Sequence, residues 1–499
     1  MLTDRVDLDE VTIEQLQARM ASGALTARQL GEAYLERIET IDRGGPRLRS
    51  IIETNPDALE IADALDRERA EGHIRGPLHG IPMVLKDNID TADRMQTTAG
   101  SLALVGVSVA QDAPVVRKLR EAGAVLLAKA NLSEWANFRS TRSSSGWSGR
   151  GRQTRNPFVL DRSPGGSSSG SAVAVSANLC LAALGTETDG SIMSPSSANG
   201  IVGIKPTVGL TSRDGVIPVS HTQDTVGPHA RTVADAAAVL SAIAERSIDY
   251  SQHLDPRALI RARIGVARRF HTGYSEHTDR VFEQALDVLR RCGAEVIDEV
   301  DIPGQAELRA NFGDTEYRAE RIVLEYDFKT DIANYLATRP DASVRTLADL
   351  IRFNDEHADQ EMPYFRQELF LASDARGPLS NELYQRALEH NRSFARGFAN
   401  LFTEHSFDAL VAPTNAPACA IDLLDGDHNL GGSALSAAVG GFPLVTVPAG
   451  FAVDLLPLGV TFMGPPMSEP TLIRFAHAFE QAHRVRRTPR FVTTALDLP

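Results

Sequence analysis

The chain has 499 residues, of which 42% are hydrophobic and 23% charged, and its formal net charge is -14. This acidic balance argues against nucleic acid or an anionic membrane as the main partner, because both bind a basic face. The three cysteines, Cys180, Cys292 and Cys419, are far apart in sequence, which excludes a disulfide framework and a zinc pattern. The length suits one large α/β unit or two to three average domains.

The first ten residues, MLTDRVDLDE, lack the basic start and the apolar centre of a signal peptide. No apolar run is long enough to span a membrane. We therefore expect a soluble chain that is cytoplasmic by default, although a leader that had been removed would leave no trace.

Residues 1–75 are predicted to be helical. Thr12-x-x-Gln15 and Thr26-x-x-Gln29 both have the form of a capping box, in which each side chain bonds the other residue's backbone. Asn55-Pro56 is predicted to begin a third helix that ends near Ala70.

From about residue 76 the pattern changes to alternating strands and helices. An apolar strand over 81–85 ends in Lys86, and a helix near 115–119 leads through Gly123 into a strand over 124–128. A second helix, glycine and strand unit follows at 281–300. These units predict an α/β fold with helices packed on the faces of a sheet.

Residues from about 305 to 405 are richer in charge and helical in pattern, which indicates an insertion that covers the α/β body. Strand-like sequence returns at 409–414 and 443–448, and a last helix is expected over 470–484. Because nothing marks a flexible linker, we predict a single domain over 1–499, with its core at about 76–240.

A stretch from Ser163 to Pro195 begins with serines, glycines and a proline, then continues into the small and apolar run 172–184, which we expect to be a buried helix. A serine flanked by glycines can be held out as a nucleophile. Lys86 ends an apolar strand, and burial there would lower its pKa and make it a base.

One alternative comes from Gly166 to Gly170, which formally fits the GxSxG pattern of Ser-His-Asp hydrolases. Ser168 would then be the nucleophile, and the histidine would be His221, His229 or His253. Turn-like sequence at 161–164 disfavours this alternative, because no buried strand leads into the motif. The chain has no phosphate loop, dinucleotide fingerprint or HExxH motif, so we expect no cofactor and no metal.

Four segments occur in a fixed order that resembles the amidase signature family: HGIPMVLKDN (79–88), GGSSSGS (165–171), GTETDGSI (185–192) and GIKPT (203–207). Further similarity continues to Asp235, and a weaker one spans nearly the whole chain. The resemblance implies the amidase-signature fold, a large twisted mixed β-sheet with helices on both faces, a helical N-terminal layer and a helical insertion. Segments 131–138 and 186–191 most resemble the peptide amidase branch, whose members hydrolyse the C-terminal amide of peptides.

The resemblance implies a Ser-cisSer-Lys triad. Ser191 matches the nucleophile, Lys86 the base and Ser167 the bridging serine, which would follow a cis peptide bond; Ser168 is the fallback for the bridging position. Such an enzyme releases ammonia from primary carboxamides through an acyl-enzyme. The backbone N–H groups of the turn are expected to form the oxyanion hole: Thr188, Asp189, Gly190 and Ser191.

Two positions depart from the commoner family pattern. Asp189 stands where most members have glycine, and Met193 where many have arginine. Asp189 either turns away to cap the following segment or accepts hydrogen bonds from an unsubstituted NH2 leaving group. Asn137 is a candidate substrate contact, and Trp135 is predicted to be packing.

Two other functions stay open. One is an amidase of another specificity, for amino acid amides, aryl amides or carbamates. The other is a component of a tRNA-dependent amidotransferase, which Asp189 and Met193 disfavour because that branch usually has glycine and arginine there. We expect a peptide or small amide as the partner, and a monomer or homodimer.

Overall fold

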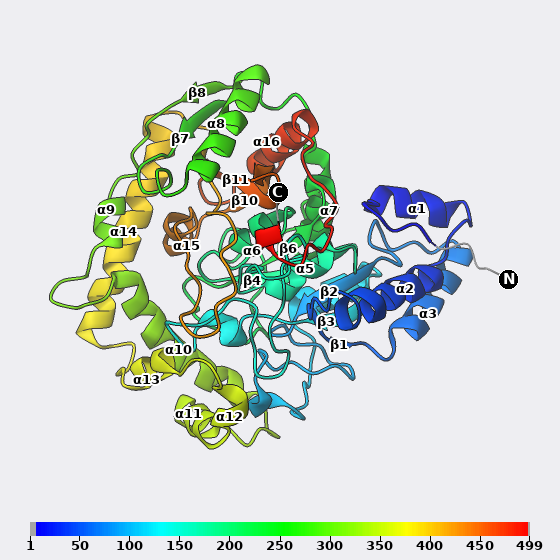
Figure 1. Cartoon of the computed structure of the whole chain (residues 1–499), viewed down its shortest axis with the longest axis horizontal. Coiled ribbons are helices and arrows are strands. Elements are labelled where there is room, and N and C mark those ends of the chain that lie inside the picture. The colour runs from blue at the N-terminus through cyan, green and yellow to red at the C-terminus, as the bar shows by residue number, and fades with distance from the viewer. Residues whose placement is uncertain (1–5, 498–499) are drawn as a thin grey trace.

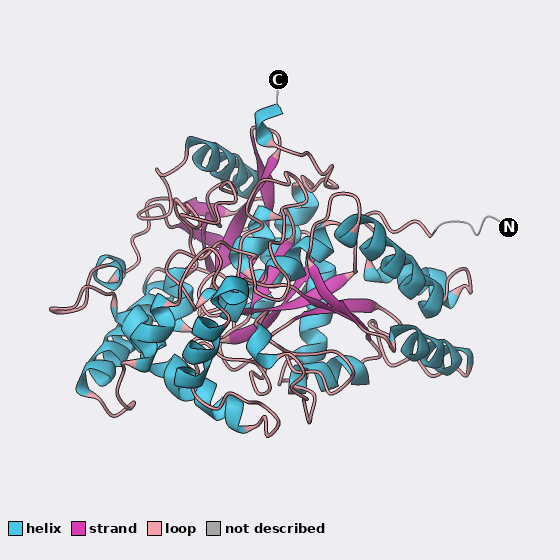
Figure 2. Cartoon of the chain, turned by 60° about the horizontal axis from the view of Figure 1, so that its bottom comes forward, coloured by secondary structure: helices cyan, strands magenta, loops and turns pink. Residues whose placement is uncertain are grey.

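The computed structural model describes residues 6–497, and its centre is one mixed sheet of eleven strands (Figures 1 and 2). In chain order the strands are β1 (Ile51–Thr54), β2 (Pro82–Lys86), β3 (Val125–Ala130), β4 (Ala182–Glu187), β5 (Val202–Lys205), β6 (Thr225–Ala230), β7 (Arg263–Val266), β8 (Glu295–Ile297), β9 (Ala409–Pro413), β10 (Leu444–Ala452) and β11 (Leu456–Met463).

The strands lie in the order β1-β3-β2-β4-β6-β5-β10-β11-β9-β7-β8. β2 pairs in parallel with both β3 and β4, and β7 pairs in parallel with β8 and β9. The other pairs are antiparallel, and the hairpin of β10 and β11 joins β5 on one side to β9 on the other. The predicted α/β class with a large mixed sheet is confirmed.

Helices at the N-terminus form a layer beside β1 to β3 (Figure 1). They are α1 (Ile13–Ala21), α2 (Ala27–Arg37) and α3 (Ala58–Ala70). Both predicted capping boxes are present. The prediction for 1–75 missed β1, and the third helix has Asp57 at its N-cap rather than Asn55, whose side chain instead accepts the N–H of Asp57.

A second group of helices packs on both faces of the sheet (Figure 2). These are α4 (Pro114–Glu121), α5 (Ser169–Ser176), α6 (Met193–Ala198), α7 (Val233–Ile243), α8 (Glu276–Arg291), α15 (Leu435–Gly440) and α16 (Glu469–Ala482). Most of the buried apolar side chains of these helices other than α15, together with those of the central strands, form the main hydrophobic core. Leu435 and Ala437 of α15 belong to a second cluster with Leu410 of β9 and Leu444 of β10. Short helical turns occur at η1 (Ile38–Arg43), η2 (Leu102–Leu104), η3 (Glu134–Asn137), η4 (Tyr250–His253) and η5 (Ala495–Asp497).

The predicted helical insertion is present as a third group, which we call the helical cover. It consists of α9 (Gln305–Arg309), α10 (Ala319–Ala337), α11 (Leu347–Glu356), α12 (Ala358–Glu361), α13 (Glu368–Asp374) and α14 (Glu382–Glu404). Phe328 and Phe370 of the cover pack against Phe138 and Trp135, which lie in the loop that follows β3. The cover is therefore fixed to a loop of the sheet core by an aromatic cluster.

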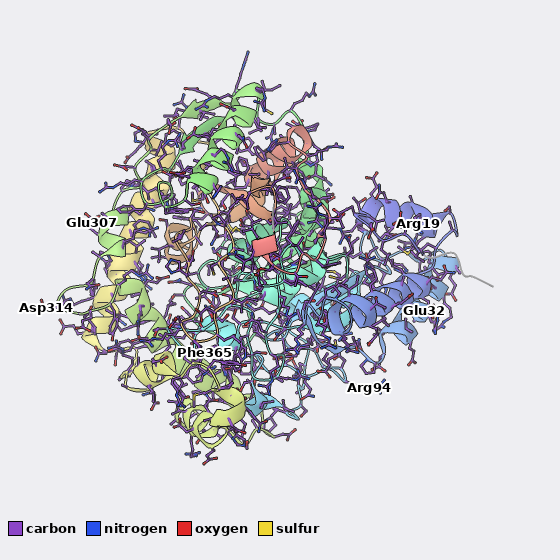
Figure 3. The ribbon with its side chains drawn as sticks, in the orientation of Figure 1. Arg19, Glu32, Arg94, Glu307, Asp314 and Phe365 are labelled. Carbon is purple, nitrogen blue, oxygen red and sulfur yellow. The ribbon has the colours of Figure 1, made fainter. Side chains whose placement is uncertain are left out.

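The two helical layers lie at opposite ends of the molecule. Figure 3 shows Arg19 and Glu32 on the N-terminal helices at one edge, and Glu307 and Asp314 of the cover at the other. None of the helices in 6–497 has both the length and the apolar character that crossing a membrane requires.

The apolar run 172–184 is not one buried helix, as its composition suggested. It begins in α5, which ends at Ser176, and finishes in β4, which starts at Ala182. The prediction also missed β11, which pairs with β9 and β10. Small residues serve equally in a buried helix and a central strand, so the run alone did not distinguish them.

Candidate active site

The ends of two parallel strands place the first part of the site. Lys86 is the last residue of β2, and Thr186 lies near the end of the neighbouring strand β4. The Nζ atom of Lys86 lies 2.7 Å from Oγ1 of Thr186 and 3.2 Å from its carbonyl oxygen. Because parallel strands end at the same edge of a sheet, residues a hundred positions apart meet here.

Lys86 also donates a hydrogen bond to Ser167, with 2.8 Å between Nζ and Oγ. Ser167 lies just before α5, and the peptide bond between Gly166 and Ser167 is cis, as the family resemblance implied. The side chains of Lys86 and Ser167 are completely buried. The two residues therefore form a contact that is closed to bulk water.

Burial lowers the pKa of Lys86 to about 7, although the negative charges of Asp224 and Glu187 oppose this shift. Near neutral pH a large fraction of this amine is therefore uncharged. A neutral amine has a free lone pair, so Lys86 is able to accept a proton.

The turn after β4 carries Ser191, and two carboxylates hold this turn in place. The Glu187 carboxylate accepts the backbone N–H groups of Ile192 at 2.6 Å and Met193 at 3.0 Å. The Thr188 hydroxyl donates to Asp224 at 2.6 Å. Glu187, Thr186 and Asp224 were not identified from the sequence as site residues.

The same turn is joined to the serine cluster through the backbone, since the N–H of Ser168 donates to the carbonyl of Ser191 at 3.1 Å. Gly190 has φ 79°, a left-handed conformation that favours glycine and that the turn requires. Within residues 6–497, the N–H groups of Asp189, Gly190 and Ser191 donate to no protein acceptor. These unpaired donors are available to a ligand.

A cleft of about 650 Å³ opens over this turn. Asp189, Gly190 and Ser191 line it together with Gly166. Its walls come from the loop at 136–145, the segment 415–435 and the helical cover, which contributes Arg309, Arg318 and Leu324. The cleft is thus bounded by the core on one side and by the cover on the other.

Asn137 lies in the cleft wall with φ 69°, and its side-chain oxygen accepts a hydrogen bond from Ser143 at 2.6 Å. This bond leaves the amide NH2 as the group that the side chain offers to a ligand. Trp135 is buried and packs edge-on against Phe370, in line with the packing predicted for it.

Asp189 lies in the cleft wall and is exposed there, with Glu320 beside its carboxyl group. Its carboxyl group hydrogen-bonds with that of Glu320 from α10. Partial burial and the charge of Glu320 raise the pKa of Asp189, while Arg318 and Arg309 oppose the rise. Asp189 does not cap the following segment, because Glu187 accepts the N–H groups there.

The Ser-His-Asp alternative finds no matching geometry. The Ser168 hydroxyl donates to the carbonyl of Thr186 at 3.0 Å and is completely buried. His229 bonds to Ser196 at 2.8 Å, and burial lowers its pKa to about 3. His221 contacts Asp331 at 2.9 Å, and His253 lies in η4 beside α7 and α16.

Comparison with known proteins agrees with this arrangement. The family model described as amidase matches residues 29–473. The chain therefore belongs to the amidase family, and it is an enzyme that hydrolyses amide bonds.

The chain is similar to individual members of this family to different degrees. The chain is 49% identical to native peptide amidase from Stenotrophomonas maltophilia, whose X-ray structure it matches with a TM-score of 0.91 over 97% of this chain and 99% of that one. It is 42% identical over 512 residues to a probable amidase of Arabidopsis thaliana, covering 98% of this chain and 93% of the relative. It is 32% identical over 503 residues to a glutamyl-tRNA(Gln) amidotransferase subunit of Moorella thermoacetica, covering 97% and 98%.

Proposed function

We propose that this amidase hydrolyses primary carboxamides, above all the C-terminal amide of peptides, and releases ammonia. The observation that carries the proposal is the 2.8 Å hydrogen bond between the buried Lys86 and Ser167, beside the turn that presents Ser191 to the cleft. It joins a base of lowered pKa to the hydroxyl of a residue whose neighbour Gly166 lines the cleft.

In the proposed mechanism Ser191 is the nucleophile. Its oxygen attacks the amide carbonyl while its proton passes to Ser167, whose own proton passes to neutral Lys86. Thr186 offers Lys86 two acceptors, its hydroxyl and its carbonyl oxygen, for the N–H groups of the amine. This arrangement leaves the lone pair of Lys86 for Ser167.

The tetrahedral intermediate carries a negative oxygen that needs hydrogen-bond donors. The unpaired N–H groups of Asp189, Gly190 and Ser191 are suited to this role, and one such donor is typically worth roughly 3 kcal/mol of transition-state stabilisation. Lys86 returns its proton through Ser167 to the leaving nitrogen, and ammonia departs. Water then cleaves the acyl-enzyme by the reverse route, so the cycle needs neither a metal nor a cofactor.

Two features support peptide amides over other substrates. The cleft, at about 650 Å³, has room for several residues of a peptide. Identity is also higher to the peptide amidase, at 49%, than to the amidotransferase component, at 32%. We expect the chain to act without a tRNA-dependent partner, as a monomer or homodimer.

The test is turnover by the purified protein alone. A panel of peptide amides, free amino acid amides and aryl amides is incubated with the wild type, Ser191→Ala and Ser168→Ala, and the products are followed by mass spectrometry. We expect the wild type to exchange the terminal amide of peptides for an acid. Ser191→Ala should lower kcat by roughly 10⁴-fold or more, and Ser168→Ala should keep measurable turnover.

Near-full turnover by Ser191→Ala would remove Ser191 as the nucleophile. Loss of activity in Ser168→Ala alone would instead favour the Ser-His-Asp alternative. If the wild type releases no ammonia from any amide unless other chains are added, the amidotransferase alternative replaces the proposal.

A further inference from the structure

One arginine in the cleft wall has no polar partner. Arg309 is the last residue of α9, is half-buried and lines the cleft. Within residues 6–497 its guanidinium group makes no ion pair and donates no hydrogen bond, and its Nε atom is buried without an acceptor. A buried donor that lacks an acceptor costs free energy, which a ligand in the cleft that accepts its hydrogen bond would recover.

Charges of both signs lie near Arg309, but within residues 6–497 none of them forms an ion pair with it. Its neighbours are Arg318, Asp189 and Glu320, and burial together with the like charge of Arg318 lowers the pKa of Arg309. The carboxyls of Asp189 and Glu320 lie together, and burial and the charge of Glu320 raise the pKa of Asp189. Arg318 lies 3.4 Å from Glu320 and forms an ion pair with it.

Other groups near Arg309 do not supply an anion. His271 is close to it and uncharged at neutral pH, because burial lowers its pKa to about 4. Glu307 belongs to the same helix, but residues two apart in a helix do not face each other, and Figure 3 shows Glu307 at the outer edge of the cover. Within the described residues 6–497, Arg309 therefore has no ion-pair partner of its own, and its guanidinium group is available to an anion in the cleft.

The position of this charge relates it to the reacting bond. Arg309 interacts electrostatically with Asp189, which lies two residues before Ser191. Arg309, Asp189 and Ser191 line the same cleft, so a group bound by Arg309 shares that cleft with the scissile carboxamide. Arginine forms paired hydrogen bonds with a carboxylate, which fits its planar fork of donors.

We propose that Arg309 is a specificity-determining residue that binds the side-chain carboxylate of an acidic residue carrying the scissile carboxamide. Peptides that end in the amide of glutamate or aspartate would then be preferred over neutral ones. This inference rests on the proposed function, since it names a substrate class for the same cleft.

The chain offers a matched control in Arg269. Arg269 and Arg309 both lie over the ring of Phe270, at 5.0 Å and 5.2 Å from its centroid. Arg269 is exposed, reaches Asp301 at 3.5 Å and does not line the cleft. Replacing either arginine removes one positive charge and one contact with Phe270, but only Arg309 faces the substrate.

The experiment compares N-acetyl-Ala-Glu-amide with N-acetyl-Ala-Met-amide, which is similar in size and neutral. Ammonia release gives kcat and KM for the wild type, Arg309→Gln, Arg309→Lys and Arg269→Gln at low ionic strength. We expect the wild type to prefer the glutamate amide. Arg309→Gln should lower the ratio of kcat/KM, glutamate amide over methionine amide, by about 10- to 100-fold, chiefly through KM.

Arg309→Lys should keep part of this ratio, because lysine supplies the charge without the fork of donors, and Arg269→Gln should keep the wild-type ratio. An unchanged ratio in Arg309→Gln overturns the inference, as does an equal loss on both substrates, which would indicate a structural role. An equal shift of the ratio in Arg269→Gln also overturns it, because general charge would then suffice. Wild type that releases no ammonia from either amide contradicts the proposed function itself.

Discussion

The two sides of the active-site cleft differ in how completely their polar groups are paired. On the core side, Lys86 and Ser167 are fully buried and bonded to each other, and Lys86 also contacts Thr186. On the cover side, Arg309 has no hydrogen bond within residues 6–497, and Glu320 of α10 lies beside the Asp189 carboxyl of the core turn. The contact between Lys86 and Ser167 is complete without a ligand, whereas Arg309 is left without a partner.

This difference separates two tasks. A proton relay must have fixed geometry before substrate arrives, so its members are locked by burial and by mutual hydrogen bonds. A recognition surface gains by leaving donors and charges for the ligand to satisfy. We therefore expect substitutions on the core side to abolish turnover of every amide, and those on the cover side to change which amide is preferred.

Among the changes that test this comparison of the two sides, replacing the base should have the largest effect. Lys86→Met keeps the length and burial of the side chain but removes the amine, and we expect kcat to fall by about 10³-fold for all amides. Lys129→Met is the matched control, because Lys129 is also a completely buried lysine, on the adjacent strand β3, and its amine bonds to Ile89 and Thr97 rather than to the cleft. Activity per folded molecule is measured for both, with folding checked by circular dichroism. Equal losses in the two variants would mean that Lys86 has only a structural role.

A smaller effect should appear in the pH profile of the wild type. The pKa of Lys86 is about 7, and only its neutral form accepts a proton. We expect kcat/KM to fall about tenfold for each pH unit below 7 and to level off above it. The same slope should appear with acidic and neutral substrates, since the base is remote from the cover. A profile that is flat between pH 5.5 and 8 contradicts a lysine base of lowered pKa.

The smallest effect should come from Asp189, which lies in the core turn but contacts Glu320 of the cover. Asp189→Asn keeps the shape of the side chain but removes its charge, and we expect the preference for primary over N-methyl amides to fall by about threefold to tenfold. Glu320→Gln is the companion variant, because it alters the partner of Asp189 without changing the turn. The ratio of kcat/KM for the two amides is measured in each. If the ratio stays at its wild-type value in Asp189→Asn, this residue does not recognise the leaving group.

The sequence predicted the core side of the site far better than the cover side. Lys86 was recognisable because a charged residue ends an apolar strand, and the serine and glycine clusters around Ser167 and Ser191 are unusual in buried sequence. These signals are local, and the cis bond before Ser167 came from the family resemblance. Glu187, a carboxylate at the end of a buried strand, gave a weaker signal.

Arg309, Arg318 and Glu320 could not be predicted as site residues. They lie in a charged, helical region where most ionisable side chains face water, and nothing in their spacing shows which of them turns toward the cleft. Their position depends on how the cover docks onto Phe138 and Trp135, which is a matter of tertiary packing. The missed strand β1 has the same cause, because its pairing partner β3 is distant in sequence.

The hairpin of β10 and β11 has a consequence for how this chain is made. In the part of the sheet that residues 6–497 form, the strands β1 to β6 are joined to the strands β7 to β9 only through this hairpin, which lies near the C-terminal end of the sequence. During synthesis from the N-terminus, the two parts of the sheet have no strand to join them until nearly all of the chain has emerged. Such non-local pairing slows folding and leaves strand edges open in the nascent protein. The continuous eleven-stranded sheet is therefore completed only when the hairpin has been made.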